Sequence, residues 1–210
     1  MLRITRKEKT VGEDGNATER TVLEGYEPDG AGRSVKLDWI ENQLTNEWAD
    51  EKIVVFIKNI GLFEAFQRRL EKHKIGAALI RGGGEYSSNE YRDAQISKFW
   101  EDPKCRVLIG TSALERSLNL QVSNKIIFVD QHLNPARMAQ LVGRIKRAGS
   151  AHKHVFTYNL LTVDTQEERY MDILATRQAL ADYVWGETNE LFEQLDPVAL
   201  LELIGRPSKA

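Results

Sequence analysis

A glutamine, a glycine and two arginines are spaced along residues 134–150 so that one face of a predicted helix can bind phosphate. Gln140, Arg144 and Arg147 fall within roughly 60° of one another when residues advance by about 100°. Guanidinium groups are planar, permanently charged donors that can bind phosphate oxygens two at a time. Gly143 borders this row and, having no side chain, lets a ligand or another backbone come close. The row predicts a phosphate-bearing partner, and the alternative is a solvated basic surface.

The sequence around this row predicts the helix that presents it. Asn134 is a favourable N-cap, and Pro135 suits the first helical position. We expect a single helix across residues 134–150. Its opposite side carries apolar residues at positions i, i+3, i+4 and i+7, which must face a core. These residues are Met138, Leu141, Val142 and Ile145.

The rest of the chain alternates between short apolar runs and amphipathic segments. The apolar runs, which predict buried strands, cover residues 52–57, 77–80, 105–109, 125–129 and 155–160. Helical periodicity begins at Ser34 and again near Phe63. A capping box, Ser87-x-x-Glu90, starts a further helix, and Thr165-x-x-Glu168 caps the last one. This alternation predicts an α/β fold, a doubly wound parallel sheet with helices on both faces.

We expect the chain to divide into three segments. Residues 1–33 predict an irregular or hairpin-like N-terminal extension, and residues 34–163 predict the α/β domain. Residues 164–210 predict a C-terminal helical brace that packs on this domain, with an ordinary core helix as the alternative.

Composition narrows the class of protein. The chain has 210 residues, 41% of them hydrophobic, which suffices for a packed core. A net charge of -2 argues against a histone-like protein but not against a local basic stripe that binds nucleic acid. The single cysteine, Cys105, rules out an intramolecular disulfide and fits a reducing compartment. We expect no signal peptide and no membrane span, and hence a soluble cytoplasmic or nucleoid-associated protein that is a monomer in isolation.

Several segments resemble motifs of superfamily-two helicases. Residues 140–149, with the pattern Gln-x-x-Gly-Arg-x-x-Arg-x-Gly, closely resemble motif six. Residues 111–120 are similar to motif five, and residues 56–59 to motif four. In the motif-five segment, the residues that stand where glycines are usual are Leu114, Glu115 and Ser117. Across residues 34–185 the chain resembles the second motor lobe of Swi/Snf-type DNA translocases.

The resemblance implies a RecA-like fold that forms one wall of an ATP cleft and one half of a DNA track. It makes Arg144 and Arg147 the catalytic residues, as arginine fingers that reach ATP. The other residues that it places at the nucleotide are Gln140, Gly143, Glu115 and Asn119. Those that it places on DNA are Lys58, Asn59, Thr111 and Ser112. Stabilisation of the loop is the alternative for Asn119, a solvated side chain for Lys58, and a polar loop without a ligand for the motif-five segment.

Two segments imitate nucleotide-binding motifs. Arg81-Gly82-Gly83-Gly84 follows a predicted strand, but a Walker A loop needs a Gly-Lys pair and the chain contains none. We interpret this segment as a turn. Asp130 follows an apolar run as a Walker B acid does, yet it leads into Asn134 and Pro135, as the segment before motif six does in Swi/Snf-type translocases. We therefore interpret Asp130 as structural.

The resemblance also implies partners. ATP with Mg²⁺ is expected to be held mainly by an N-terminal RecA-like lobe with Walker A and B motifs, which this chain lacks, and no metal ligand is expected within it. The nucleic acid is expected to be duplex DNA, bound without sequence preference. On this interpretation the chain is half of an ATP-dependent DNA helicase or translocase and is inactive alone. The alternatives are a non-catalytic nucleic-acid-binding or regulatory module with the same fold and, more distantly, a nucleotide-sugar transferase lobe.

Overall fold

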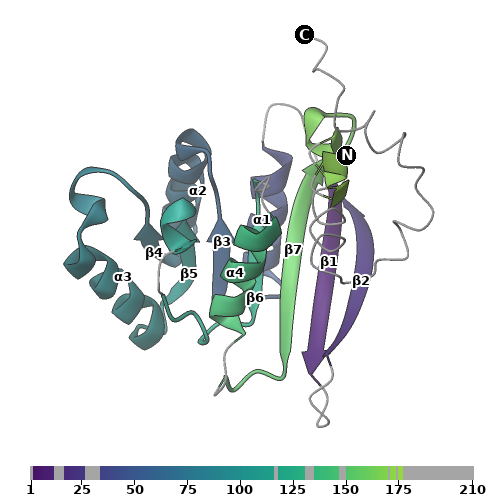
Figure 1. Cartoon of the computed structure of the whole chain (residues 1–210). Coiled ribbons are helices and arrows are strands. Elements are labelled where there is room, and N and C mark those ends of the chain that lie inside the picture. The colour runs from purple at the N-terminus through teal and green to yellow at the C-terminus, as the bar shows by residue number, and fades with distance from the viewer. Residues whose placement is uncertain are drawn as a thin grey trace.

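The computed structural model describes residues 2–11, 17–26, 34–115, 118–130, 135–146, 150–169, 171–173 and 175–176. These residues form a seven-stranded sheet in the order β2-β1-β7-β6-β3-β5-β4 (Figure 1). Strands β7, β6, β3, β5 and β4 run parallel to one another, as predicted. Their bounds are β3 (Ile53–Phe56), β4 (Gly76–Ile80), β5 (Cys105–Gly110), β6 (Lys125–Phe128) and β7 (His154–Thr162).

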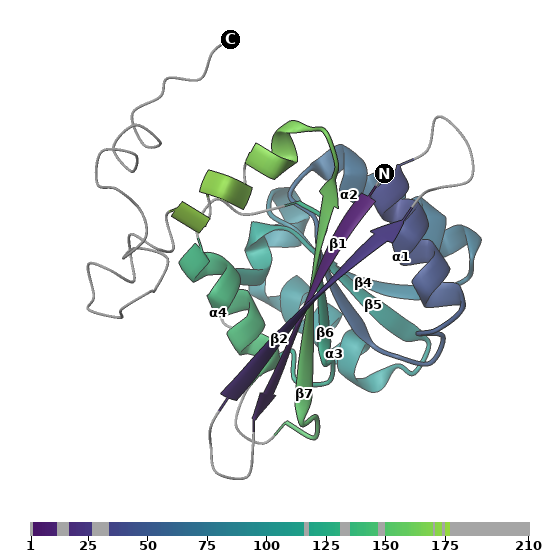
Figure 2. The same cartoon turned by 90° about the vertical axis from the view of Figure 1, so that its right-hand side faces the viewer.

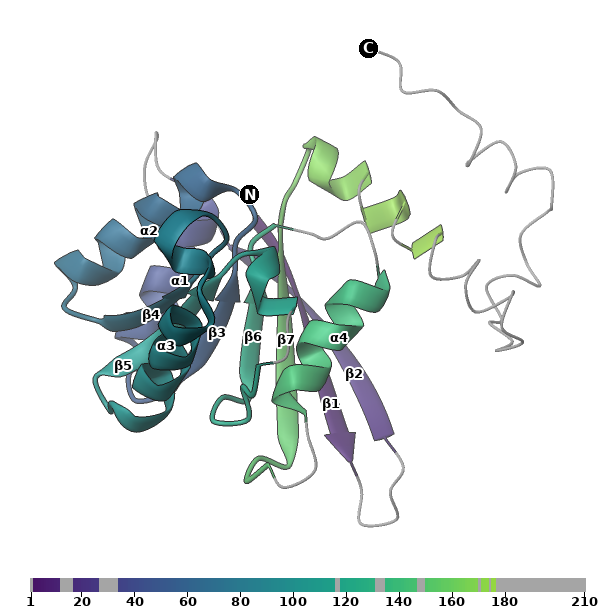
Figure 3. The ribbon, with the colours of Figure 1, turned by 60° about the vertical axis from the view of Figure 1, so that its left-hand side comes forward.

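Helices cover both faces of the sheet, which confirms the doubly wound architecture. Helices α1 (Val35–Thr45) and α2 (Ile60–Lys72) pack on one face. Helices α3 (Asn89–Glu101) and α4 (Pro135–Ile145) pack on the other. Figure 2 shows α1 and α4 on opposite sides of the sheet, and Figure 3 shows the face that α3 and α4 cover.

The core is divided by the sheet into two apolar layers. Ile53 and Val55 of β3 belong to the layer under α1 and α2, whereas Val54 and Phe56 belong to the layer under α3 and α4. All four side chains are fully buried. Burial on both faces is why the parallel strands appear in the sequence as continuous apolar runs rather than as alternating patterns.

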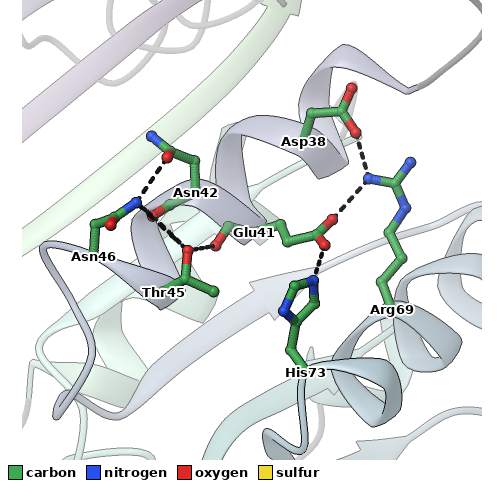
Figure 4. A network of polar contacts seen from close by, with 7 residues as sticks. All are labelled: Asp38, Glu41, Asn42, Thr45, Asn46, Arg69 and His73. Carbon is green, nitrogen blue, oxygen red and sulfur yellow. Dashed lines mark hydrogen bonds and ion pairs between the residues drawn. The ribbon is translucent and has the colours of Figure 1, made fainter. Parts of the chain in front are cut away.

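A network of polar side chains also joins α2 to α1 (Figure 4). Arg69 of α2 donates to Asp38 and Glu41 of α1, at 2.5 and 3.0 Å. His73, just after α2, pairs with the other carboxylate oxygen of Glu41. The network holds the last turn of α2 against α1.

The N-terminal segment contributes a hairpin to the sheet. Strand β1 (Leu2–Val11) pairs antiparallel with β2 (Ala17–Tyr26), and β1 also pairs antiparallel with β7. The hairpin form agrees with one of the two forms predicted for residues 1–33, but its pairing with β7 was not predicted. That pairing joins strands from opposite ends of the described chain, so no local pattern signals it.

Two predicted helix ends were wrong. The N-cap of α3 is Ser88, whose Oγ accepts from the Tyr91 N–H at 3.1 Å, because Ser87 belongs to a preceding 3₁₀ turn (Gly84–Ser87). Helix α4 ends at Ile145, and Lys146 and Ser150, the next described residues, are not helical. The Leu120 N–H donates to the Arg144 carbonyl at 3.2 Å, so a loop amide satisfies one of the carbonyls at the end of the helix.

The start of the last helix is confirmed, whereas most of its predicted length lies outside the described residues. Residues 166–169, 171–173 and 175–176 are helical, and the Glu167 N–H donates to Thr165 Oγ1 at 3.3 Å. The expected cap Asn134, and the continuation toward residue 185, lie outside the description. Among the helices that the structure describes, none has the length and apolarity needed to span a membrane.

Candidate nucleotide and nucleic-acid interface

Polar loops meet at the carboxyl edge of the sheet because the ladder of hydrogen bonds continues past the strand ends. The Ile57 N–H donates to the Gly110 carbonyl at 2.9 Å, and the Val129 N–H donates to the Phe56 carbonyl at 3.0 Å. Strands β6, β3 and β5 are neighbours in the sheet, so the loops that follow them start side by side. The structure thus brings the loop carrying Lys58 next to the loop carrying Ser112.

Asp130 fixes the backbone of the loop at Lys58 and Asn59, hereafter the 58–59 loop. Its Oδ2 accepts the N–H of Lys58 at 2.7 Å and the N–H of Asn59 at 2.9 Å. The Asn59 side chain caps α2, since its Oδ1 accepts from the Leu62 N–H at 3.1 Å. These contacts give Asp130 a structural role, as predicted, and leave the Lys58 side chain exposed at the edge.

The two hydroxyl residues after β5 have different surroundings. Thr111 is buried, and its Oγ1 accepts from the Ala113 N–H at 3.4 Å. Ser112 is exposed and begins a 3₁₀ turn (Ser112–Glu115). Of this pair, Ser112 is therefore the better placed for a ligand outside the chain.

The glycine segment after β4 is a turn, as predicted. Gly83 and Gly84 have φ values of 96° and 53°, a left-handed conformation that favours glycine. The Arg81 guanidinium lies 3.9 Å from the centroid of the Tyr86 ring and 3.3 Å from Glu64 Oε1. The hydrogen bond with Tyr86, followed by the contact with Glu64, raises the pKa of Arg81 above its ordinary value.

The two described members of the predicted polar row, Gln140 and Arg144, lie on α4 away from its buried side. Leu141 and Ile145 are fully buried, while Gln140 and Gly143 are exposed and Arg144 is half-buried. A Cβ placed at Gly143 would meet no atom of the described residues within 4 Å, apart from its own helix backbone and chain neighbours, so within that part of the chain a ligand can approach this side of the helix. Arg147 lies outside the described residues, and nothing is described of the Glu115 side chain.

Asn119 lies beside the end of α4, away from the carboxyl edge. Its neighbour Leu120 donates its N–H to the Arg144 carbonyl, and Asn119 Oδ1 accepts from the Gln121 N–H at 3.3 Å. The same loop then reaches the amino end of β3, where Ser123 Oγ donates to the Lys52 carbonyl at 2.7 Å. The candidates therefore form two groups: an edge group around Lys58 and Ser112, and a helix group around Arg144 and Asn119.

Sequence reasoning missed one residue of the helix group. Trp100, near the end of α3, donates its Nε1 proton to the Asn119 carbonyl at 2.9 Å, while 38% of the residue remains exposed. Because α3 and the Asn119 loop are joined in this way, Trp100 helps to fix the loop against α4. The sequence placed Trp100 on a predicted helix, but no pattern in it indicated a hydrogen bond with the Asn119 carbonyl.

Covalent catalysis by cysteine is excluded by the surroundings of Cys105. The thiol is fully buried at the start of β5, and burial raises its pKa. A thiol held in its neutral form inside the core is a poor nucleophile. Among the residues that the structure describes, no group of three or more His, Cys, Asp or Glu side chains could hold a metal ion.

The doubly wound sheet, the polar loops at its carboxyl edge and the glutamine and arginine face of α4 define a RecA-like lobe of the helicase type. The chain matches the family described as helicase conserved C-terminal domain over residues 35–149, more than half of its length, and belongs to that family. All the candidate residues lie within the matched range.

The relatives of the chain are Swi/Snf-type ATP-dependent helicases. The uncharacterized ATP-dependent helicase YqhH of Bacillus subtilis (strain 168) is 30% identical over 146 residues, 70% of this chain and 25% of that protein. The SNF2 domain-containing protein CLASSY 1 of Arabidopsis thaliana is 30% identical over 144 residues, 66% of this chain and 11% of that protein. The chain thus spans a quarter or less of these two relatives.

A solved structure supports the fold independently. The C-terminal part of the Fun30 ATPase domain is similar with a TM-score of 0.59 and 25% sequence identity. The similarity covers 68% of this chain and 45% of that chain. It confirms the RecA-like fold predicted from the sequence.

Proposed function

We propose that this chain is the second motor lobe of an ATP-dependent DNA translocase or helicase. The observation that carries the proposal is α4, which presents Gln140 and Arg144 away from the core, with open space at Gly143 and the Asn119 loop at its end. This arrangement occurs in a domain of the helicase C-terminal family.

The helix group is the part that acts on ATP in this proposal. Arg144 and Arg147 donate to the phosphate oxygens and stabilise the charge that develops as the terminal phosphate is transferred to water. Gln140, Asn119 and Glu115 contact the nucleotide, and Gly143 allows it to approach the helix. Arginines cannot cradle the phosphates and hold Mg²⁺ by themselves. We therefore assign those tasks to an N-terminal lobe with Walker A and B motifs.

The edge group is the part that acts on DNA. Lys58, Asn59, Thr111 and Ser112 lie where parallel sheets bind ligands, beyond the carboxyl ends of the strands. The exposed ammonium of Lys58 and the exposed hydroxyl of Ser112 suit phosphate oxygens and do not distinguish between bases, while Asn59 and Thr111 hold the backbone beside them. Closure of the two lobes on ATP, and opening after hydrolysis, then moves the edge group along the duplex backbone.

The test is ATP hydrolysis by the longest native protein that contains this chain, measured with and without duplex DNA. We expect turnover that DNA stimulates, together with negligible turnover by the 210-residue chain alone. DNA binding without any turnover in the longest native protein would favour a regulatory nucleic-acid-binding module instead.

A further inference from the structure

Lys36 is a buried lysine whose contacts lie at the carboxyl edge of the sheet. Its side chain, on the first turn of α1, is 8% exposed. The Nζ donates to the Val129 carbonyl at 2.6 Å and pairs with the carboxylate of Glu167. A buried ammonium is costly without such partners, so the position of Lys36 is tied to both of them.

Glu167 uses its second oxygen on β7. Its Oε2 accepts the N–H of Thr162, the last residue of β7, at 2.7 Å. Glu167 also lies in the first turn of the helix that follows β7. One carboxylate therefore ties the start of the C-terminal helix to the end of β7 and, through Lys36, to α1 and the residue after β6.

The contacts of Lys36 are continuous with those of the 58–59 loop. Val129, whose carbonyl accepts from Lys36, directly precedes Asp130. Asp130 in turn accepts the N–H groups of Lys58 and Asn59. A continuous chain of contacts thus runs from Glu167 to the 58–59 loop through one ammonium, one peptide unit and one carboxylate.

We propose that Lys36 and Glu167 are positioning residues that couple the C-terminal helix to the 58–59 loop. The use of this coupling on DNA rests on the function proposed above. When the C-terminal helix moves relative to the sheet, the Lys36–Glu167 pair transmits that movement to Asp130 and shifts Lys58 at the edge. The coupling allows the C-terminal helix to change how Lys58 contacts a phosphate backbone.

The chain contains a second lysine–glutamate pair that serves as a matched control. Lys125 is 9% exposed and pairs with Glu51, whose side chain is 39% exposed. Lys125 begins β6, so this pair lies at the amino end of the same strand whose carboxyl end Lys36 contacts. Loss of either pair disturbs a buried lysine, but only loss of Glu167 acts next to Asp130.

Amide hydrogen exchange of the 210-residue chain, read residue by residue by NMR, tests the coupling. We expect Glu167→Ala to accelerate exchange at the Lys58 and Asn59 amides by roughly tenfold or more, and Glu51→Ala to change it less than about twofold, because only the first releases Asp130. If Glu167→Ala does not fold, Glu167→Gln against Glu51→Gln makes the same comparison without a change of shape.

Equal exchange in the two variants, or unchanged exchange at Lys58 and Asn59 in the Glu167 variant, overturns the coupling. A second measurement concerns DNA in the longest native protein. There we expect the DNA concentration for half-maximal ATPase to rise more in Glu167→Ala than in Glu51→Ala. A parent protein that binds no DNA contradicts the proposed function, while the exchange result still decides the coupling.

Discussion

Side-chain oxygens fix backbone amides beside the residues that we assign to ligands. Asp130 accepts two N–H groups of the 58–59 loop, Asn59 caps α2, and Thr111 accepts from the turn that follows it. These side chains shape the edge, and the exposed Lys58 and Ser112 are the groups left to meet a phosphate. One set of residues thus holds the backbone at the edge of the sheet, and their neighbours are free to contact a phosphate in the proposed function.

Trp100→Phe tests whether the indole hydrogen bond holds the Asn119 loop. The substitution keeps an aromatic ring and removes the Nε1 donor. We therefore expect the free energy of unfolding, measured in urea, to fall by about 1 kcal/mol. In the two-lobe protein, the KM for ATP should rise more than kcat falls, because the loop beside Arg144 loosens. An unfolding free energy and a KM equal to those of the parent would show that the bond has no positioning role.

Most helices and strands could be predicted from the sequence because the burial of each one produces a periodic or continuous apolar pattern in its own residues. Burial on both faces produces the apolar runs of β3 and β6, and the single apolar side of α4 produces its stripe. Contacts between segments that are distant in sequence produce no such pattern. The addition of β1 to β7, the Asp130 contact with the 58–59 loop, and the position of Asn119 beside α4 all join segments distant in sequence. The sequence therefore assigned the site residues to ATP or to DNA only through the resemblance, whereas the structure shows which of them lie side by side.

Gly143→Ala should raise the stability of α4 while weakening its proposed role at the nucleotide. Alanine is a better helix former than glycine, and open space surrounds the position, so thermal unfolding should show a gain of roughly 0.5–1 kcal/mol. In the two-lobe protein the added methyl group lies where we expect the nucleotide to approach, so ATP affinity should fall. A more stable variant with the ATP affinity of the parent would remove Gly143 from the nucleotide site.

Gly110→Ala, at the end of β5, should destabilise the protein, because an added methyl group has no open space there. A Cβ there would lie 2.1 Å from Cγ of Leu114, and that side chain is fully buried, so it has little room to move. We expect a loss of about 1–3 kcal/mol in unfolding free energy from overpacking. Adding Leu114→Ala should reduce the loss attributable to the new methyl group, and additive costs in the double variant would rule out this clash.

At the scale of the whole molecule, a net charge of -2 means that any DNA affinity must come from local groups. Binding of duplex DNA by the 210-residue chain should be weak and independent of sequence. With roughly two to four phosphate contacts, the logarithm of the binding constant should fall with the logarithm of salt concentration with a slope of about -2 to -4. Fluorescence anisotropy over a salt series measures this slope. Salt-insensitive binding, or strong preference for one duplex, contradicts the edge group as the DNA contact.

The central claim is that Arg144 of α4 acts on ATP, and Arg144→Ala in the two-lobe protein tests it most directly. The matched control is Arg68→Ala, which removes an exposed arginine from α2 on the other face of the sheet. Both variants should lose less than about 1 kcal/mol of stability and retain DNA binding. Turnover of ATP should fall by on the order of 10³ to 10⁵ in Arg144→Ala and stay at the parent rate in Arg68→Ala. Hydrolysis at the parent rate by a folded Arg144→Ala protein would make α4 an ordinary basic surface and contradict the account.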